Sequence, residues 1–229
     1  MATSLGYNIS RNPIAQSFYV DQTTGCYVTK VDLYFQAKGS AAPVMLQLRP
    51  MVNGFPSTSE IVPSSTVYVN TANVNTSTDV SLATSFEFDE PIYLKGLTDY
   101  CIVCTTTDPN YLIYIAQIDE YVVGTTANRV NRNPALGSLF YSQNGGTFSP
   151  AQNQDLTFVV HRANFTATSG NVVLKNAPLP MKLLDEDPVT TNAGSTTVRI
   201  AHEGHGFVVN DPVTVLGMDS SATIGGLAT

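Results

Sequence analysis

The residue types best suited to metal chemistry lie near the C-terminal end, in His202-Glu203-Gly204-His205. Imidazole and carboxylate groups are common zinc ligands. A zinc-protease helix carries its two histidines four positions apart, whereas His202 and His205 are three apart. The glycines in and after the motif also disfavour a helix and favour a tight bend. We therefore interpret the motif as a strand followed by a turn, keep metal binding as the alternative, and assign no metal ligand.

Cys101 and Cys104 form a C-x-x-C pair, a spacing found in metal and redox sites. They lie in DYCIVCTTT (99–107), a run whose composition predicts a strand. Residues three apart on a strand point to opposite faces, so the two thiols cannot share a metal or close a disulfide unless the strand is broken. We predict that both are small buried hydrophobic side chains, and that Cys26 is a lone thiol in a turn.

No other constellation predicts catalysis. The sequence has no G-x-S-x-G nucleophile elbow and no glycine-rich phosphate loop followed by a lysine. We expect His161, at the end of a predicted strand, to hydrogen-bond a neighbour. The adjacent acids Asp89-Glu90 and Asp119-Glu120 are typical of strand-end turns, not of paired glycosidase carboxylates. We therefore assign no catalytic or cofactor-binding residue, no cofactor and no enzymatic activity.

The composition narrows the classes of partner. The 229 residues carry a net charge of -7, with 43% hydrophobic and only 13% charged residues. Nucleic-acid binding requires clustered basic residues, and Arg129 with Arg132 is the nearest approach to a cluster, so we expect no nucleic-acid partner. No apolar run approaches the roughly 18 residues of a membrane span, and the N-terminal residues do not resemble a signal peptide. The low charge suits either a surface buried against other subunits or simply a threonine-rich β protein.

Alternation of apolar and polar residues predicts half-buried strands over 27–37, 44–50 and 83–89. Side chains expected to point inward are Tyr27, Val31, Leu33, Phe35, Val44, Leu46, Leu48, Phe86 and Phe88, and those expected to point outward are Lys30, Asp32, Gln36, Gln47, Arg49 and Glu87. The runs 99–107 and 111–118 are apolar on both faces, which predicts central strands covered on both sides.

Turn signals separate these runs, with Asn53-Gly54 the strongest. We expect 136–141 and 155–161 to form a last pair of strands around Asn144-Gly145-Gly146. In total the pattern gives roughly nine or ten strands and no helical period, which favours an all-β fold with an antiparallel, jelly-roll-like β-sandwich.

Four segments follow from changes in composition. We expect an N-terminal arm over 1–15, the β-sandwich over 16–165, an extended connector over 166–195 and a small β unit over 196–229. The connector contains three prolines and the acidic run Asp185–Asp187, which we interpret as a solvated linker. Because so few residues bury little surface alone, either the last unit packs on the sandwich or on a partner, or it is incomplete and the chain is a fragment of a longer one; we favour the fragment.

Three stretches carry a resemblance to a known family: IAQSFYVDQTTGCYVTKVDLYFQAK (14–38), PVMLQLRPMVNGFPSTSEIVPSSTVYVN (43–70) and FEFDEPIYLKGLTDYCIVC (86–104). Together they resemble a region of large virion structural proteins of T4-like contractile-tailed phages, notably those that infect cyanobacteria. Residues 197–217 resemble small β units that recur in tandem along phage tail proteins. The resemblance implies a tail or baseplate protein of the virion, assembled in the host cytoplasm.

The expected function is accordingly a scaffold or adaptor that binds other virion structural proteins, in many copies or as a homo-oligomer, with no membrane partner. The arm and the connector are expected to carry contacts between subunits, for example by strand addition to a neighbour's sheet.

The alternative is a host-surface glycan-binding module, such as a receptor-binding or fibre protein. Residues 138–162 resemble the last strands of jelly-roll modules of extracellular proteins, some of which bind carbohydrate. This chain has Phe148 where those modules often have tryptophan. Tyr111, Tyr114, Tyr121 and Tyr141 are the candidate sugar contacts, although core packing is an equally simple role for them.

Overall fold

The structure is a computed structural model that describes residues 2–3, 6–9, 13–133, 136–142, 145–166, 184, 188–202, 205, 207–209, 213, 223–224 and 227–228. The chain divides into two compact units, Met1–Lys182 and Leu183–Thr229. Among the described residues both units contain strands, and the named strands pair antiparallel throughout, which confirms the all-β prediction. Among the described residues, no helix is long and apolar enough to span a bilayer.

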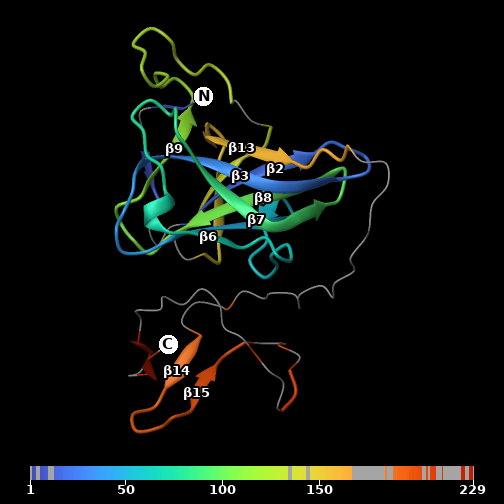
Figure 1. Cartoon of the computed structure of the whole chain (residues 1–229), viewed down its shortest axis with the longest axis vertical. Coiled ribbons are helices and arrows are strands. Elements are labelled where there is room, and N and C mark those ends of the chain that lie inside the picture. Colours follow the sequence, from blue (N-terminus) through green and yellow to red (C-terminus); the bar gives the residue numbers. More distant parts are fainter. Residues whose placement is uncertain are drawn as a thin grey trace. The chain divides into compact units, whose positions relative to one another are not determined.

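Sheet 1 of the first unit has β3 at its centre, flanked by β7 and β13 (Figure 1). β9 is a further neighbour of β3, and it also pairs with β1 and β12. The strands of sheet 1 are β1 (Gly6–Asn8), β3 (Cys26–Ala37), β7 (Ala83–Leu94), β9 (Leu112–Gln117), β12 (Gln154–Leu156) and β13 (Phe158–Arg162).

Sheet 2 has the order β11-β10-β2-β8-β4-β5, and β6 also pairs with β4. Its strands are β2 (Ile14–Val20), β4 (Val44–Val52), β5 (Phe55–Pro56), β6 (Val67–Val69), β8 (Thr98–Thr105), β10 (Leu139–Ser142) and β11 (Phe148–Ala151). Asn53 and Gly54 both have positive φ, 53° and 83°, and form the predicted tight turn between β4 and β5.

The larger of two hydrophobic clusters draws side chains from both sheets, so their inner faces pack together. Alternation predicted most of these residues correctly: Val31, Leu33, Phe35, Val44, Leu46, Leu48, Phe86 and Phe88 are all buried. β8 and β9 are buried on both faces, as their continuous apolar runs indicated. One polar bridge crosses this core, because Gln16 Nε2 on β2 donates to Asp155 Oδ1 on β12 at 3.1 Å.

Tyr27 was predicted to point inward, and this is wrong. Between Val28 and Lys30, β3 has one residue more than the facing part of β13, a β-bulge, so the alternation changes phase at the start of β3. Val28 is buried in the core instead, and Tyr27 is 42% exposed on the outer face. The sequence carries a trace of the bulge, since the adjacent pairs Tyr27-Val28 and Thr29-Lys30 interrupt the alternation.

The expected last strand pair is also wrong. β10 pairs with β11, whereas residues 154–162 leave for sheet 1, where β12 pairs with β9 and β13 pairs with β3. The segment expected as an arm contributes β1 and the start of β2, and β1 pairs with β9 of its own chain. Because Ala2, Thr3 and Ile9 are buried as well, this segment packs against its own chain.

The second unit contains two short hairpins. β14 (Val189–Thr191) pairs with β15 (Val198–Ile200), and β16 (Thr223–Ile224) pairs with β17 (Leu227–Ala228). β14 lies inside the predicted connector, so that segment is not extended linker throughout, whereas Asp185–Asp187 lie outside the described residues. The alternation at 198–200 predicted β15 correctly.

Candidate functional site

The outer face of sheet 2 is covered. Its side chains form a second, smaller hydrophobic cluster of Ala15, Cys101, Val103, Phe140 and Phe148, all buried. The segment after β4 provides part of the cover, since the ring of Phe55 meets Phe140 edge-on at 6.1 Å. The outward-pointing residues in this part of the sheet therefore belong to an interior, whereas Tyr19 and Asp99, towards one end of the same face, are exposed.

Arg49 lies within this covered face and is 5% exposed. Its Nε and Nη2 atoms donate to Gln47 Oε1 at 3.1 and 2.8 Å, and its Nη1 atom donates to the Ser57 carbonyl oxygen at 3.2 Å. Burial lowers the pKa of Arg49 to about 10. No carboxylate of the described residues forms an ion pair with it, so hydrogen bonds alone satisfy a buried cation.

The C-x-x-C pair divides between the two faces of β8, as the strand geometry predicted. Cys104 belongs to the core between the sheets, and Cys101 belongs to the outer cluster beside Arg49. Both thiols are fully buried, and burial raises the pKa of Cys101 to about 12 and also raises that of Cys104. Neither thiol is ionised near neutral pH, so both behave as hydrophobic side chains.

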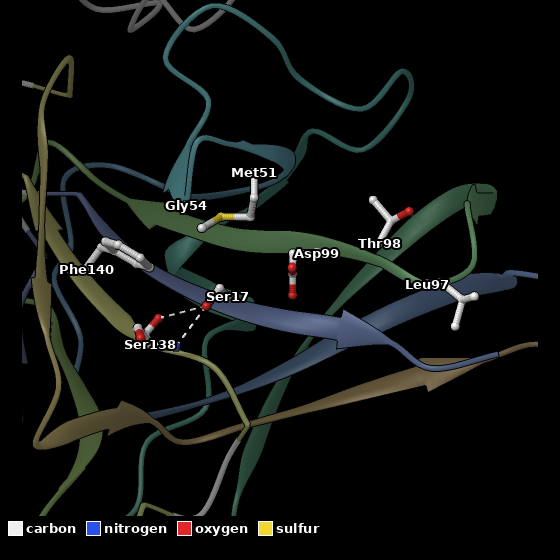
Figure 2. A pocket seen from close by; sticks show the side chains of 8 residues that line it. All are labelled: Ser17, Met51, Gly54, Leu97, Thr98, Asp99, Ser138 and Phe140. Atoms are coloured by element: carbon white, nitrogen blue, oxygen red, sulfur yellow. Dashed lines mark hydrogen bonds between the residues drawn. The ribbon is translucent and has the colours of Figure 1, made fainter. Parts of the chain in front are cut away.

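At one end of the covered face the surface opens into a hollow of about 450 Å³, which we call the Leu97 hollow. Figure 2 shows Asp99 in the middle of its lining residues, with the hydrogen-bonded pair Ser17 and Ser138 nearby. The hollow is lined by Ser17, Met51, Gly54, Leu97, Thr98, Asp99, Ser138 and Phe140. These residues come from β2, β4, β8, β10 and the turns that join them.

The outer face of sheet 1 carries a polar group that we call the Asp32 cluster: Lys30, Asp32, Ser85 and His161. Ser85 Oγ donates to Asp32 Oδ1 at 2.5 Å, and His161 Nε2 lies 2.6 Å from Asp32 Oδ2. Lys30 Nζ lies 3.8 Å from Asp32 Oδ1. The prediction that His161 hydrogen-bonds a neighbour is confirmed, across 129 residues of sequence.

Opposing effects set the pKa of Asp32. Burial alone would raise it, but the hydrogen bonds from Ser85 and His161 and the positive charges of His161 and Lys30 outweigh burial, so the pKa is lowered. The carboxylate stands between serine and histidine, whereas a nucleophilic relay requires histidine between serine and aspartate. This geometry ties β13 to β3 and β7; it does not activate Ser85.

Beside the Asp32 cluster lie three exposed rings, Tyr27, Tyr93 and Phe165, which we call the aromatic cluster. The ring centre of Tyr27 is 5.2 Å from that of Tyr93 and 5.3 Å from that of Phe165. Tyr93 is 50% and Phe165 68% exposed. Sequence reasoning missed this cluster, because the bulge places Tyr27 on the outer face.

The tyrosines singled out as sugar contacts lie elsewhere. Tyr111 and Tyr114 are buried, and Tyr141 is half-buried and stacks on Tyr7 at 4.4 Å. Tyr121 is exposed, with the guanidinium of Arg129 4.1 Å from its ring centre. Phe148 is buried and cannot stack on a sugar.

The histidine motif of the second unit is only partly described, because Glu203 and Gly204 lie outside the described residues. His205 Nδ1 accepts a hydrogen bond from the backbone N–H of Phe207 at 2.9 Å. Within the part of the chain that the structure describes, no group of three or more His, Cys, Asp or Glu side chains is placed to hold a metal ion.

Comparison with known proteins does not assign a family to these surfaces. No protein-family model matches the sequence, and no curated protein matches it with significant similarity. Function is therefore inferred from the covered and open faces of the two sheets and from the hollow at the end of sheet 2.

Proposed function

We propose that the chain is a structural component of a phage tail or baseplate, built on a jelly-roll-like sandwich that acts as a scaffold or adaptor between other virion proteins. The observation that carries the proposal is the aromatic cluster, an exposed apolar patch on a rigid sheet. Exposed patches rimmed by polar residues are typical of protein interfaces, and the Asp32 cluster supplies such a rim. The resemblance of 14–104 to phage virion proteins supports the same role.

The sheet that presents the aromatic cluster is suited to a protein–protein interface. β3, which carries Tyr27, Lys30 and Asp32, is paired on both edges and packs on the shared core. A side chain on such a strand loses little freedom on binding, which reduces the entropic cost of an interface. The low charge of the chain also suits burial against neighbours.

The proposal includes no catalytic activity. The Asp32 cluster lacks the serine–histidine contact of a nucleophilic relay, and the Leu97 hollow offers one carboxylate rather than an acid–base pair. A glycan-binding role has weaker support, since of its four candidate tyrosines only Tyr121 is well exposed.

Particle composition tests the proposal. Virions of the phage that encodes the chain are purified on a density gradient and analysed by quantitative mass spectrometry. The chain is expected at a fixed ratio to the tail proteins in intact particles. Its absence from purified particles, or its loss on washing at moderate salt, would overturn the proposal.

A pair of variants tests the surface that carries it. Tyr93→Ser removes an exposed ring of the aromatic cluster, and Tyr68→Ser removes a ring of similar exposure, 45%, from β6 of sheet 2. When each variant competes with the wild-type chain during assembly, we expect Tyr93→Ser to be under-represented in particles and Tyr68→Ser to be incorporated normally. Equal incorporation of both would show that the aromatic cluster is not the contact surface.

A further inference from the structure

The Leu97 hollow combines apolar walls with a single charge. Met51, Leu97 and Phe140 supply the apolar part of the lining, and Asp99 is the one charged residue among the eight that line it. The side-chain hydroxyls of Ser17 and Thr98 are already engaged. The Ser17 hydroxyl donates to the Ser138 carbonyl and accepts from the Ser138 N–H, and the Thr98 hydroxyl donates to the Gly96 carbonyl.

The carboxylate of Asp99, by contrast, is exposed, and no hydrogen bond or ion pair reaches it from the described residues. Neighbouring positions on the same face explain why. Asp99 lies opposite Tyr19 on β2, Met51 of β4 lines the same hollow, and neither side chain is basic. The hollow is therefore a negatively charged site with an apolar surround.

The rim of the hollow is held in a fixed shape by unusual backbone. Leu97 has a positive φ of 53°, which is unfavourable for a residue other than glycine, and its apolar side chain is nevertheless 57% exposed. Gly137 has φ 151°, and a Cβ atom there would lie 2.1 Å from the Ser17 carbonyl oxygen. Strained, exposed residues gather where a surface serves a ligand, and a preformed rim lowers the cost of binding.

We propose that the Leu97 hollow binds the basic side chain of a partner protein, an ammonium or guanidinium group on a short apolar stem. The stem packs along Met51, Leu97 and Phe140 while the charged head pairs with Asp99, which is how lysine and arginine cover apolar surface. A metal ion is a poor fit, because one carboxylate supplies too few ligands. The inference rests on the proposed function, since it names the chemistry of one partner contact.

The test uses the full chain and two small probes. Butylammonium and butylguanidinium are titrated into the isotopically labelled protein, and backbone amide shifts are followed by NMR. Saturable shifts are expected at Ser17, Leu97, Asp99 and Ser138. Pentanol and pentanoate, which keep the stem but lack the positive charge, are expected to bind at least about tenfold more weakly, since a tenfold change corresponds to about 1.4 kcal/mol.

Two variants locate the charge. Asp99→Asn keeps the shape of the side chain, and we expect it to weaken both cationic probes at least about fivefold, an effect that shrinks as salt rises. Asp89→Asn makes the same change at an exposed carboxylate of β7 and should leave binding unaltered. Absence of saturable shifts at the hollow, or equal binding by wild type and Asp99→Asn, would overturn the inference.

The inference and the proposed function can fail separately. If the wild-type chain is found in particles but its hollow binds neither cationic probe, the inference fails and the structural role stands. If the probes bind at the hollow but the chain is absent from particles, the structural role fails, and a partner with a basic side chain must be sought outside the virion.

Discussion

On the outer face of sheet 2, Arg49, Cys101 and Phe140 are buried beneath the segment that follows β4, whereas on the outer face of sheet 1 Tyr27 and Tyr93 are exposed by 42% and 50%. Both faces grow from strands with the same alternation of apolar and polar residues. The segment that follows β4 contributes to this difference, because the ring of Phe55 packs against Phe140 and the Ser57 carbonyl oxygen accepts a hydrogen bond from Arg49. A polar residue that alternation points away from the core can thus still end in an interior.

The comparison also separates two roles within one domain. The covered face adds a second packed layer and holds β4, β8 and β10 rigidly, while the open face leaves the aromatic cluster available for a partner. We expect partner binding on the surfaces that no described segment of the chain covers. These are the open face of sheet 1 and the Leu97 hollow at the end of sheet 2.

Thiol labelling gives the largest expected contrast. At pH 8.5, Cys26, half-buried at the start of β3, should react with a small disulfide reagent, whereas Cys101 and Cys104 should react about a thousandfold more slowly, because reaction requires opening of the structure. Mass spectrometry of the native and the urea-unfolded protein identifies the sites. Rapid native labelling of Cys101 would mean that the outer face of sheet 2 is open.

Ring truncations should differ strongly between the two faces. Phe140→Ala, on the covered face, is expected to lower the free energy of unfolding by about 3–5 kcal/mol, since it leaves a cavity. Tyr93→Ala, on the open face, should cost at most about 1 kcal/mol. Urea denaturation followed by circular dichroism measures both values, and similar costs would contradict the comparison.

Arg49 tests what its hydrogen bonds contribute. Arg49→Ala removes both the stem and the donors to Gln47 and Ser57, and we expect a loss of about 3 kcal/mol. Arg49→Met restores most of the packing and should cost only about 1–2 kcal/mol. Lys95→Met, at an exposed position after β7, is the control, with an expected change below about 0.5 kcal/mol. An Arg49→Ala protein as stable as the control would show that the guanidinium is solvated.

The smallest effect is the pH dependence of the Asp32 cluster. Because the folded-state pKa of Asp32 is lowered, its contribution is present above the unfolded pKa of about 4 and is lost as the pH falls through the lower folded value. Asp32→Asn should therefore cost about 0.5–1 kcal/mol at pH 6, and the difference from wild type should shrink as the pH is lowered below about 4. Denaturation midpoints across this range provide the measurement. A gap that does not shrink as the pH falls would assign the loss to packing, and Asp89→Asn serves as the surface control.

Sequence reasoning succeeded for strands in which burial of one face imposes an alternation of apolar and polar residues. Val31, Leu33 and Phe35 point inward, Cys101 and Cys104 take opposite faces, and Asn53-Gly54 turns the chain. It failed where the answer depends on partners far along the chain. The break in alternation at 27–30 marks the bulge only once the facing strand is known, and the return of 154–162 to sheet 1 does not alter the local pattern.

The surfaces proposed for function were harder still to predict. The Asp32 cluster joins residues from β3, β7 and β13, and the Leu97 hollow joins three turns that are separated in sequence. The low charge of the sequence suggested a surface suited to burial against partners, but it could not indicate where on the sheets such a surface would lie, because that depends on the register of the strands.

The strand pairing described above has a consequence for how the chain folds as it leaves the ribosome. Several early strands pair with strands that lie far along the chain. β2 pairs with β8 and β10, so that Ile14 lies opposite Tyr141, and Leu33 of β3 lies opposite Phe158 of β13. At a synthesis rate of about 5–20 residues per second, the first strands spend several seconds without their neighbours. Such a topology favours late folding, so interrupted translation is expected to yield chains with unpaired strands that chaperones and proteases recognise. Only chains that include β13 can complete the pairing of β3 in sheet 1.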